Sequence, residues 1–168
     1  MKIKILGTCA AEGWPALFCK CQACQKAREL GGKNIRTRSS LQIDQLLKID
    51  FPPDTLVHTY KYGLELHKLK YLLFTHSHSD HLCAGELEFM TPPYAFPTVF
   101  DTLKILGNKT SIENIKKAIR DTPFSEYPGF LNEINAFQEI SLIPYTITTL
   151  KAIHAPGEEA LNYIIEKD

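Results

Sequence analysis

Residues 76–81 read His76-Ser77-His78-Ser79-Asp80-His81, and they follow directly on the apolar run Tyr71-Leu72-Leu73-Phe74-Thr75. The apolar run predicts a strand that is covered on both faces. Four of the next six side chains are imidazoles or carboxylates, which are ligands that zinc takes at catalytic sites. In a loop that leaves a strand, the first two histidines can project to one side and bind one ion. The aspartate and the last histidine can then bind a neighbouring ion. The stretch therefore predicts a metal site. Two ions held there would generate hydroxide at neutral pH and clamp the oxygens of a phosphoryl or acyl group.

The alternative is a surface histidine tract that binds metal adventitiously. Tracts of that kind are polar and irregular on both sides. This one follows a buried strand and leads into Leu82-Cys83-Ala84-Gly85, so a built metal site is the better interpretation.

The pattern H-x-H-x-D-H after an apolar strand resembles the signature of the metallo-β-lactamase superfamily. The resemblance implies an α/β (α+β) fold, an αββα sandwich with a dinuclear metal site at the edge of its two sheets. It implies that His76, His78 and a later histidine bind the first metal. It also implies that Asp80 and His81 contribute to the second metal, with Asp80 as the catalytic residue that orients the attacking oxygen.

The expected later histidine is His154, which lies 73 residues beyond His81. It follows a predicted strand over 146–153, and Ala155-Pro156-Gly157 turns the chain immediately after it. The alternative is a histidine at a strand end without a ligand role.

The segment Lys48-Ile49-Asp50-Phe51-Pro52-Pro53-Asp54 resembles the strand and turn that precede the metal loop in this superfamily. The resemblance implies that Asp50 supports the metal loop by accepting hydrogen bonds from it. The family prefers glycine where this chain has Phe51-Pro52. The alternative is that Asp50 is a turn residue with only local hydrogen bonds.

A second cluster of ligands has the form Cys19-x-Cys21-x-x-Cys24 and follows a loop over 7–15. Both segments are similar to the N-terminal region of one superfamily branch. That branch contains the phosphoribosyl cyclic phosphate phosphodiesterase of phosphonate degradation and a related protein of pyrroloquinoline quinone biosynthesis. The resemblance implies that Cys19, Cys21 and Cys24 bind a structural zinc. The alternative is a group of three thiols without metal.

Three thiolates need a fourth ligand, because structural zinc sites are almost always four-coordinate. The branch supplies a histidine from near its C-terminus, and no histidine follows His154 here. His58, His67 and Cys83 are the candidates, and their spacing favours none of them.

The chain has 168 residues, of which 44% are hydrophobic and 23% charged, as expected of one folded domain. Lys and Arg number 19, as do Asp and Glu. A formal charge of zero argues against a nucleic-acid partner, because binding through counterion release needs a basic surface. No apolar run approaches the roughly 18 residues of a membrane span, so we expect no membrane partner. Five cysteines, an odd number, in a chain without an export signal indicate the reducing cytoplasm.

The rest of the chain predicts strands mixed with a few helices, as in a layered α/β or α+β domain. Helices are predicted over 21–30 and from the capping box at 110–113 to about residue 120. Strands are predicted over 2–5, 41–50 (one or two strands, with a turn at Asp44-Gln45), 137–144, 146–153 and 161–166.

On the superfamily resemblance, residues 1–168 form a single domain that is the N-terminal part of the fold, with its second half missing. The segment 161–168 reads as the strand that normally follows the His154 loop. In the family, the next strand carries a bridging aspartate and a final histidine comes later. We expect the unpaired strand edge to expose apolar surface and to favour a homo-oligomer.

Together these features predict a metal-dependent hydrolase. We expect a phosphodiesterase that cleaves a small cyclic phosphate or similar small-molecule phosphodiester through a metal-bound hydroxide. Its cofactors would be a dinuclear Zn²⁺ centre, with Mn²⁺ as the other candidate ion, and one structural Zn²⁺. The segment 91–97, with Tyr94 and Phe96, would either form a wall of the substrate site or cover the core. The alternatives are a non-catalytic zinc-binding accessory protein of a biosynthetic pathway, and a lactonase or thioesterase on the same fold.

Overall fold

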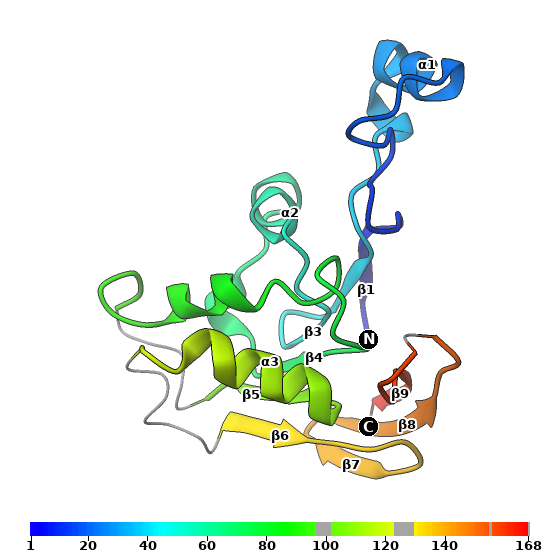
Figure 1. The fold of residues 1–168 in the computed structure, drawn as a ribbon. Coiled ribbons are helices and arrows are strands. Elements are labelled where there is room, and N and C mark those ends of the chain that lie inside the picture. Colours follow the sequence, from blue (N-terminus) through cyan, green and yellow to red (C-terminus); the bar gives the residue numbers. More distant parts are fainter. Residues whose placement is uncertain (97–101, 123–129, 155, 168) are drawn as a thin grey trace.

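Two β-sheets lie face to face in the computed structural model, which describes residues 1–96, 102–122, 130–154 and 156–167 (Figure 1). Among these residues the first sheet has the strand order β1-β2-β3-β4-β5-β6. The strands are β1 (Ile3–Gly7), β2 (Ser40–Ile43), β3 (Leu47–Ile49), β4 (Tyr71–Leu73), β5 (Lys104–Gly107) and β6 (Leu131–Glu133). β1, β2 and β3 pair antiparallel, whereas β3 to β6 are parallel. All three residues of β4 are buried, which confirms the prediction from the apolar run.

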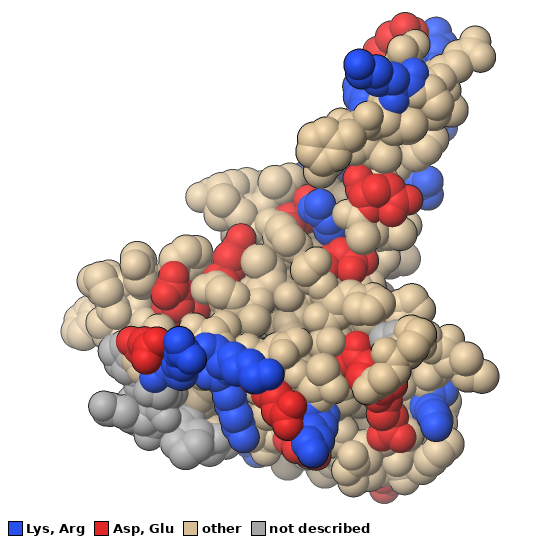
Figure 2. All heavy atoms as spheres, in the orientation of Figure 1, with Lys and Arg blue, Asp and Glu red and all other residues tan. Residues whose placement is uncertain are grey.

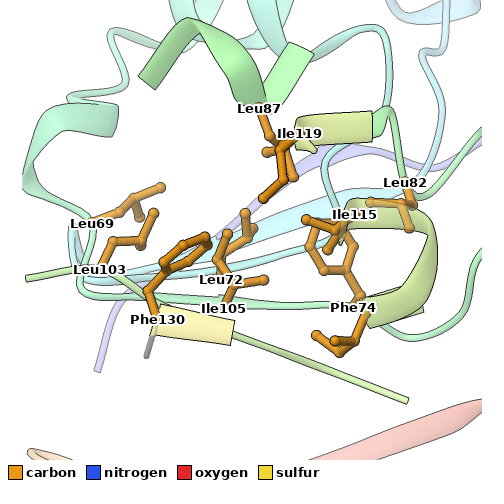
Figure 3. Packing of buried hydrophobic residues seen from close by; sticks show 11 residues of the cluster. Leu69, Leu72, Phe74, Leu82, Leu87, Leu103, Ile105, Ile115, Ile119 and Phe130 are labelled. Carbon is orange, nitrogen blue, oxygen red and sulfur yellow. The ribbon is translucent and has the colours of Figure 1, made fainter. Parts of the chain in front are cut away.

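Helices cover one face of this sheet. They are α2 (Thr55–Tyr62), η2 (Leu66–Lys68), η3 (Ala84–Met90) and α3 (Lys109–Ile119). Ile112, Ile115 and Ile119 recur at helical spacing on α3, and all three are buried. Figure 3 shows the packing: Leu72 of β4 and Ile105 of β5 point toward the buried side chains of α3 and η3. This core holds β4 rigidly in place beneath the loop that follows it.

The predicted start of α3 is wrong by two residues. The capping box predicts Thr110 as the N-cap, but the helix begins at Lys109 with Asn108 as its N-cap. Asn108 Oδ1 accepts a hydrogen bond of 2.8 Å from the Ser111 amide. Asparagine is among the strongest N-cap residues, and Asn108 follows β5 directly, so the helix starts at the first residue able to cap it.

The second sheet covers the other face of the first. Its antiparallel strands are β7 (Glu139–Leu142), β8 (Tyr145–Lys151) and β9 (Leu161–Lys167), in that order. Leu47 and Leu73 of the first sheet share a buried cluster with Tyr145, Ile147 and Leu161 of the second. Helices, first sheet and second sheet therefore form the α, β and β layers of the predicted sandwich.

Two hydrogen bonds fix β9 against the end of β4. The Leu161 amide donates to the Thr75 carbonyl at 2.8 Å, and the Tyr163 hydroxyl donates to the Phe74 carbonyl at 2.6 Å. Because Thr75 immediately precedes the histidine motif, these bonds bring the C-terminal strands to the edge where the motif loop begins.

Residues between β1 and β2 leave the sheets as an arm that projects from the body (Figure 1). The arm contains α1 (Gln22–Leu30) and η1 (Gly32–Asn34). Its two sides are joined by a bridge between Trp14 and Arg36. The predicted helix over 21–30 is confirmed, with Gly31 closing it at a positive φ of 58°. The predicted turn at Asp44-Gln45, between β2 and β3, is also found, with Asp44 at φ 50°.

Acidic and basic side chains are interspersed over the arm, α3 and the second sheet on the face shown in Figure 2. This pattern fits the balanced charge of the sequence. Among the described helices, none is long and apolar enough to cross a lipid bilayer.

Candidate metal centre

Three of the predicted ligands meet at the edge between the sheets. His76 and His78 lie on the loop after β4, and His154 lies on the loop after β8. One ring nitrogen from each lies within 4.8 Å of the others. The ring centroids of His76 and His78, and of His76 and His154, are 4.6 Å apart. His154, which lies 76 positions beyond His78 in the chain, is thus brought to the two motif histidines, as the motif and the later histidine predict.

His76 is the buried member of the group, with 3% of its surface exposed. Its Nδ1 lies 3.0 Å from the Thr75 hydroxyl, while its buried Nε2 has no hydrogen-bond partner among the described residues. Burial, together with the neighbouring histidines, lowers the pKa of His76 to about 4, although Asp50 opposes this shift. The ring is therefore neutral at pH 7. An unpartnered buried nitrogen costs about 1–3 kcal/mol, and a metal ion is a natural partner for this lone pair.

Asp50 directly follows β3 and supports this loop. It is buried, with a positive φ of 59°. Its Oδ2 lies 2.7 Å from His81 Nδ1, and its Oδ1 accepts the Thr75 amide at 2.9 Å. The Thr75 hydroxyl donates to the same carboxylate. The predicted supporting contacts are present, and the local-turn alternative is wrong.

Asp80 and His81 form a second pair of ligands beside the three histidines. Asp80 is 9% exposed, and its Oδ2 lies 3.4 Å from His81 Nε2. Burial alone would lower the pKa of His81, but the hydrogen bond and charge of Asp50, with the charge of Asp80, raise it above its ordinary value. Asp80 Oδ2 and His81 Nε2 are therefore suited to share a proton or to bind one cation between them.

Cys19, Cys21 and Cys24 gather on the arm, with their sulfur atoms within 4.8 Å of one another. Cys21 caps α1, and its Sγ accepts the Cys24 amide at 3.5 Å. This bond, with hydrogen bonds from the other two thiols, lowers the pKa of Cys21 to about 7. Burial raises the pKa of Cys24. Three converging sulfurs, one of them readily ionised, suit a thiolate metal site.

The fourth-ligand candidates do not join this group. His58 lies inside α2, where it is fully buried and its Nε2 lies 2.7 Å from the Thr37 hydroxyl. Neither His67 nor Cys83 belongs to the cysteine group among the described residues. The fourth ligand is therefore not identified among the described residues, because the arm carries the cysteines away from the body.

The segment with Tyr94 and Phe96 does not cover the core. Phe96 is 94% exposed and Tyr94 is 62% exposed. The ring of Tyr94 packs edge-on against Phe89, with centroids 5.1 Å apart. A role in a substrate wall stays a prediction, and residue 97 lies outside the described residues.

Glu158 and Asn108 belong to the centre but were not predicted from the sequence. The Glu158 carboxylate accepts hydrogen bonds from Ser77, between the first two histidines, and from Asn108. The only signal in the sequence was a pair of glutamates, Glu158 and Glu159, soon after His154.

No protein-family model and no curated protein sequence matches this chain. Solved structures do match. A diphosphatase from the PhnP family has a TM-score of 0.72 and 21% identity over 97% of this chain and 61% of that chain. The Zn²⁺-bound PqqB from Methylobacterium extorquens has a TM-score of 0.66 and 16% identity over 98% of this chain and 61% of that chain. The metallo-β-lactamase fold protein YhfI from Bacillus subtilis has a TM-score of 0.60 and 21% identity over 98% of this chain and 56% of that chain. This chain thus spans about three fifths of the length of these structures.

Proposed function

We propose that this chain, which has the metallo-β-lactamase fold, is a metal-dependent hydrolase that cleaves phosphodiester bonds in small molecules. One observation carries the proposal. The buried Nε2 of His76 has no partner among the described residues, and His76 belongs to a group in which a ring nitrogen of each of His76, His78 and His154 lies within 4.8 Å of the others. Such a group is suited to bind a divalent ion in the way that catalytic zinc sites do.

Each residue of the centre has a role in this proposal. His76, His78 and His154 would hold one ion, and Asp80 and His81 would help to hold a second. Bound ions supply Lewis-acid chemistry, activating water and polarising a phosphoryl oxygen. Zinc is the first candidate and manganese the second, because both accept imidazole and carboxylate ligands.

Asp80 is the proposed catalytic residue. The residue is 9% exposed, and its carboxylate is oriented by the contact of 3.4 Å between its Oδ2 and His81 Nε2. An oxygen of Asp80 would accept a hydrogen bond from the attacking water and so align it with the phosphorus. Asp50 keeps His81 in place through Nδ1, which leaves Nε2 directed at Asp80.

The preference for phosphoryl over acyl substrates is supported by the comparisons. The structure with a TM-score of 0.72 is a diphosphatase of the PhnP family. The cysteine group on the arm supports the same branch, and we propose a structural zinc at Cys19, Cys21 and Cys24. We place the protein in the cytoplasm, because a reducing compartment keeps thiols from forming disulfides and leaves them free to bind metal.

The test is metal analysis together with hydrolysis of bis(4-nitrophenyl) phosphate by the chain loaded with Zn²⁺ or Mn²⁺. We expect turnover that falls at least about 100-fold in His78→Ala, with loss of bound metal. His67→Ala is the matched control, because His67 is exposed and lies outside the histidine group. Equal turnover in wild type and His78→Ala would overturn the proposal.

The second candidate is a zinc-binding accessory protein without activity, and the cysteine group favours it. In that case the chain binds one zinc through thiolates and shows no turnover with either metal. Hydrolysis of an aryl ester or lactone in place of the phosphodiester would instead indicate the lactonase or thioesterase alternative.

A further inference from the structure

The carboxylate of Glu158 has an unusual set of partners. The Ser77 amide donates to both of its oxygens at 3.2 Å, and the Ser77 hydroxyl donates to Oε1 at 2.9 Å. The Asn108 side-chain amide donates to Oε2, also at 2.9 Å. All of these partners donate, so this site suits an ionised carboxylate, which only accepts hydrogen bonds.

These bonds join the two loops that carry the three histidines. Ser77 stands between His76 and His78, and Glu158 follows His154 by four positions. Ser77 and Glu158 are 81 positions apart in the chain. His78 and His154 are both exposed, so the surrounding core does not fix them. Hydrogen bonding across the two loops is therefore a means of keeping their rings together.

Asn108 connects this contact to the rigid part of the fold. It is 2% exposed and caps α3 through its Oδ1. Its Nδ2 donates to the Glu159 carbonyl at 2.8 Å as well as to Glu158. The N-terminus of a helix carries a partial positive charge that favours a nearby carboxylate. The position of Glu158 is thus set by a helix whose apolar face lies in the core.

We propose that Glu158 is a positioning residue of the metal centre. Its carboxylate holds the His154 loop against the loop of His76 and His78, so that the three ring nitrogens stay within reach of one ion. This inference rests on the metal centre of the proposed function, but not on the reaction or the substrate. Glu158 acts through Ser77 and the loop backbone and does not touch the substrate.

The test is the affinity for Mn²⁺, measured by the electron paramagnetic resonance of the free ion during titration of the whole chain. Manganese is chosen because thiolates bind it poorly, so the cysteine group does not interfere. We expect Glu158→Gln to weaken Mn²⁺ binding about 10- to 100-fold, the usual effect of losing a partner that orients ligands. Thermal unfolding of the metal-free variant provides the structural readout and should change little.

Glu159→Gln is the matched control. The Glu159 carboxylate accepts the Ala136 amide at 3.0 Å and makes none of the described contacts with Ser77. We expect its Mn²⁺ affinity to equal that of the wild type. Unchanged affinity in Glu158→Gln, or an equal loss in Glu159→Gln, would overturn the inference.

Ser77→Ala keeps the inference testable if Glu158→Gln does not fold. It removes the hydrogen bond from the Ser77 hydroxyl and leaves the bonds from the Ser77 amide in place. We therefore expect the Mn²⁺ affinity to fall about 3- to 10-fold, which is less than the effect of removing the Glu158 carboxylate. Unchanged affinity in Ser77→Ala would then count against the inference. A wild-type chain that binds Mn²⁺ but hydrolyses no phosphodiester would contradict the proposed function alone and leave the role of Glu158 standing.

Discussion

His81 Nδ1 and Asp50 Oδ2 lie 2.7 Å apart, at the ends of two neighbouring parallel strands. β3 ends just before Asp50, and β4 leads into the loop that contains His81. Because the carboxyl ends of parallel strands lie at one edge of a sheet, the topology itself brings the carboxylate to the imidazole. The Asp50 backbone also joins this edge, because its amide donates to the Leu73 carbonyl at 2.9 Å.

Replacing Asp50 by Asn should therefore damage the metal centre. The amide is nearly the same size but presents NH₂ to donors from Thr75 and His81, so it cannot accept all of their hydrogen bonds. We expect hydrolysis of bis(4-nitrophenyl) phosphate to fall about 10- to 100-fold, measured at saturating metal. Activity equal to that of the wild type would show that Asp50 does not support the centre.

Lys48 gives a pH dependence that the metal-free chain should show. The side chain is fully buried, donates to the Ser40 hydroxyl and lies 5.9 Å from the Phe51 ring centroid. Burial lowers the pKa of Lys48 to about 7, against a smaller opposing effect of Asp50. The unfolded chain holds this proton up to about pH 10. The free energy of unfolding should therefore rise with pH from about 7 toward 10, by on the order of 3 kcal/mol.

Urea unfolding at several pH values measures this slope, and Lys48→Met is the comparison. Methionine fills a similar volume without a charge, so the rise between pH 7 and 10 should largely disappear. The variant should be at least as stable as the wild type at pH 7. An equal slope in both proteins would show that Lys48 is not the group responsible.

Asp44 gives a second pH dependence of stability, at low pH. The Tyr145 hydroxyl, the Lys2 amide and Lys167 hold the pKa of Asp44 well below its ordinary value. A carboxylate with a depressed pKa stabilises the fold above its ordinary pKa of about 4, and this contribution is lost as the pH falls toward the native pKa. Asp44→Asn should thus be less stable than the wild type by about 1 kcal/mol at pH 7, and the two should converge in acid. A stability difference that does not change between pH 7 and pH 2 would contradict this account.

The cysteine group predicts a spectroscopic signature on the arm. With Co²⁺ in place of zinc, thiolate ligands should give a strong near-ultraviolet charge-transfer band. Cys21→Ser should abolish the band, because it removes the thiolate with the lowered pKa. Cys9→Ser is the control, since Cys9 lies outside the group among the described residues. A band that survives Cys21→Ser would argue against the site.

The sequence predicts local features of this fold well, and the reasons are physical. The apolar run before His76 specifies a buried strand, and the motif specifies ligands at its end. His154 could be selected because the other unassigned histidines, His58 and His67, both precede the motif. The turn at Asp44-Gln45 and the helix closed by Gly31 follow from the conformational preferences of single residues.

Long-range side-chain contacts could not be predicted in the same way. Glu158 meets Ser77 across 81 positions, and periodicity carries no information about such a pair. The exposure of Phe96 and the separation of the cysteines from His58 depend on where loops and the arm run in space. The predicted start of α3 is wrong because two residues only two positions apart, Asn108 and Thr110, can each cap a helix.

Anomalous diffraction from crystals grown with Zn²⁺ tests the central claim most directly. We predict a peak at the zinc edge bonded to ring nitrogens of His76, His78 and His154, at the distance of about 2.0–2.1 Å that zinc keeps to histidine. A peak among Cys19, Cys21 and Cys24 would show that the crystals had taken up the metal. Density for zinc at the cysteines with none at the three histidines would contradict the claim that they form a metal centre.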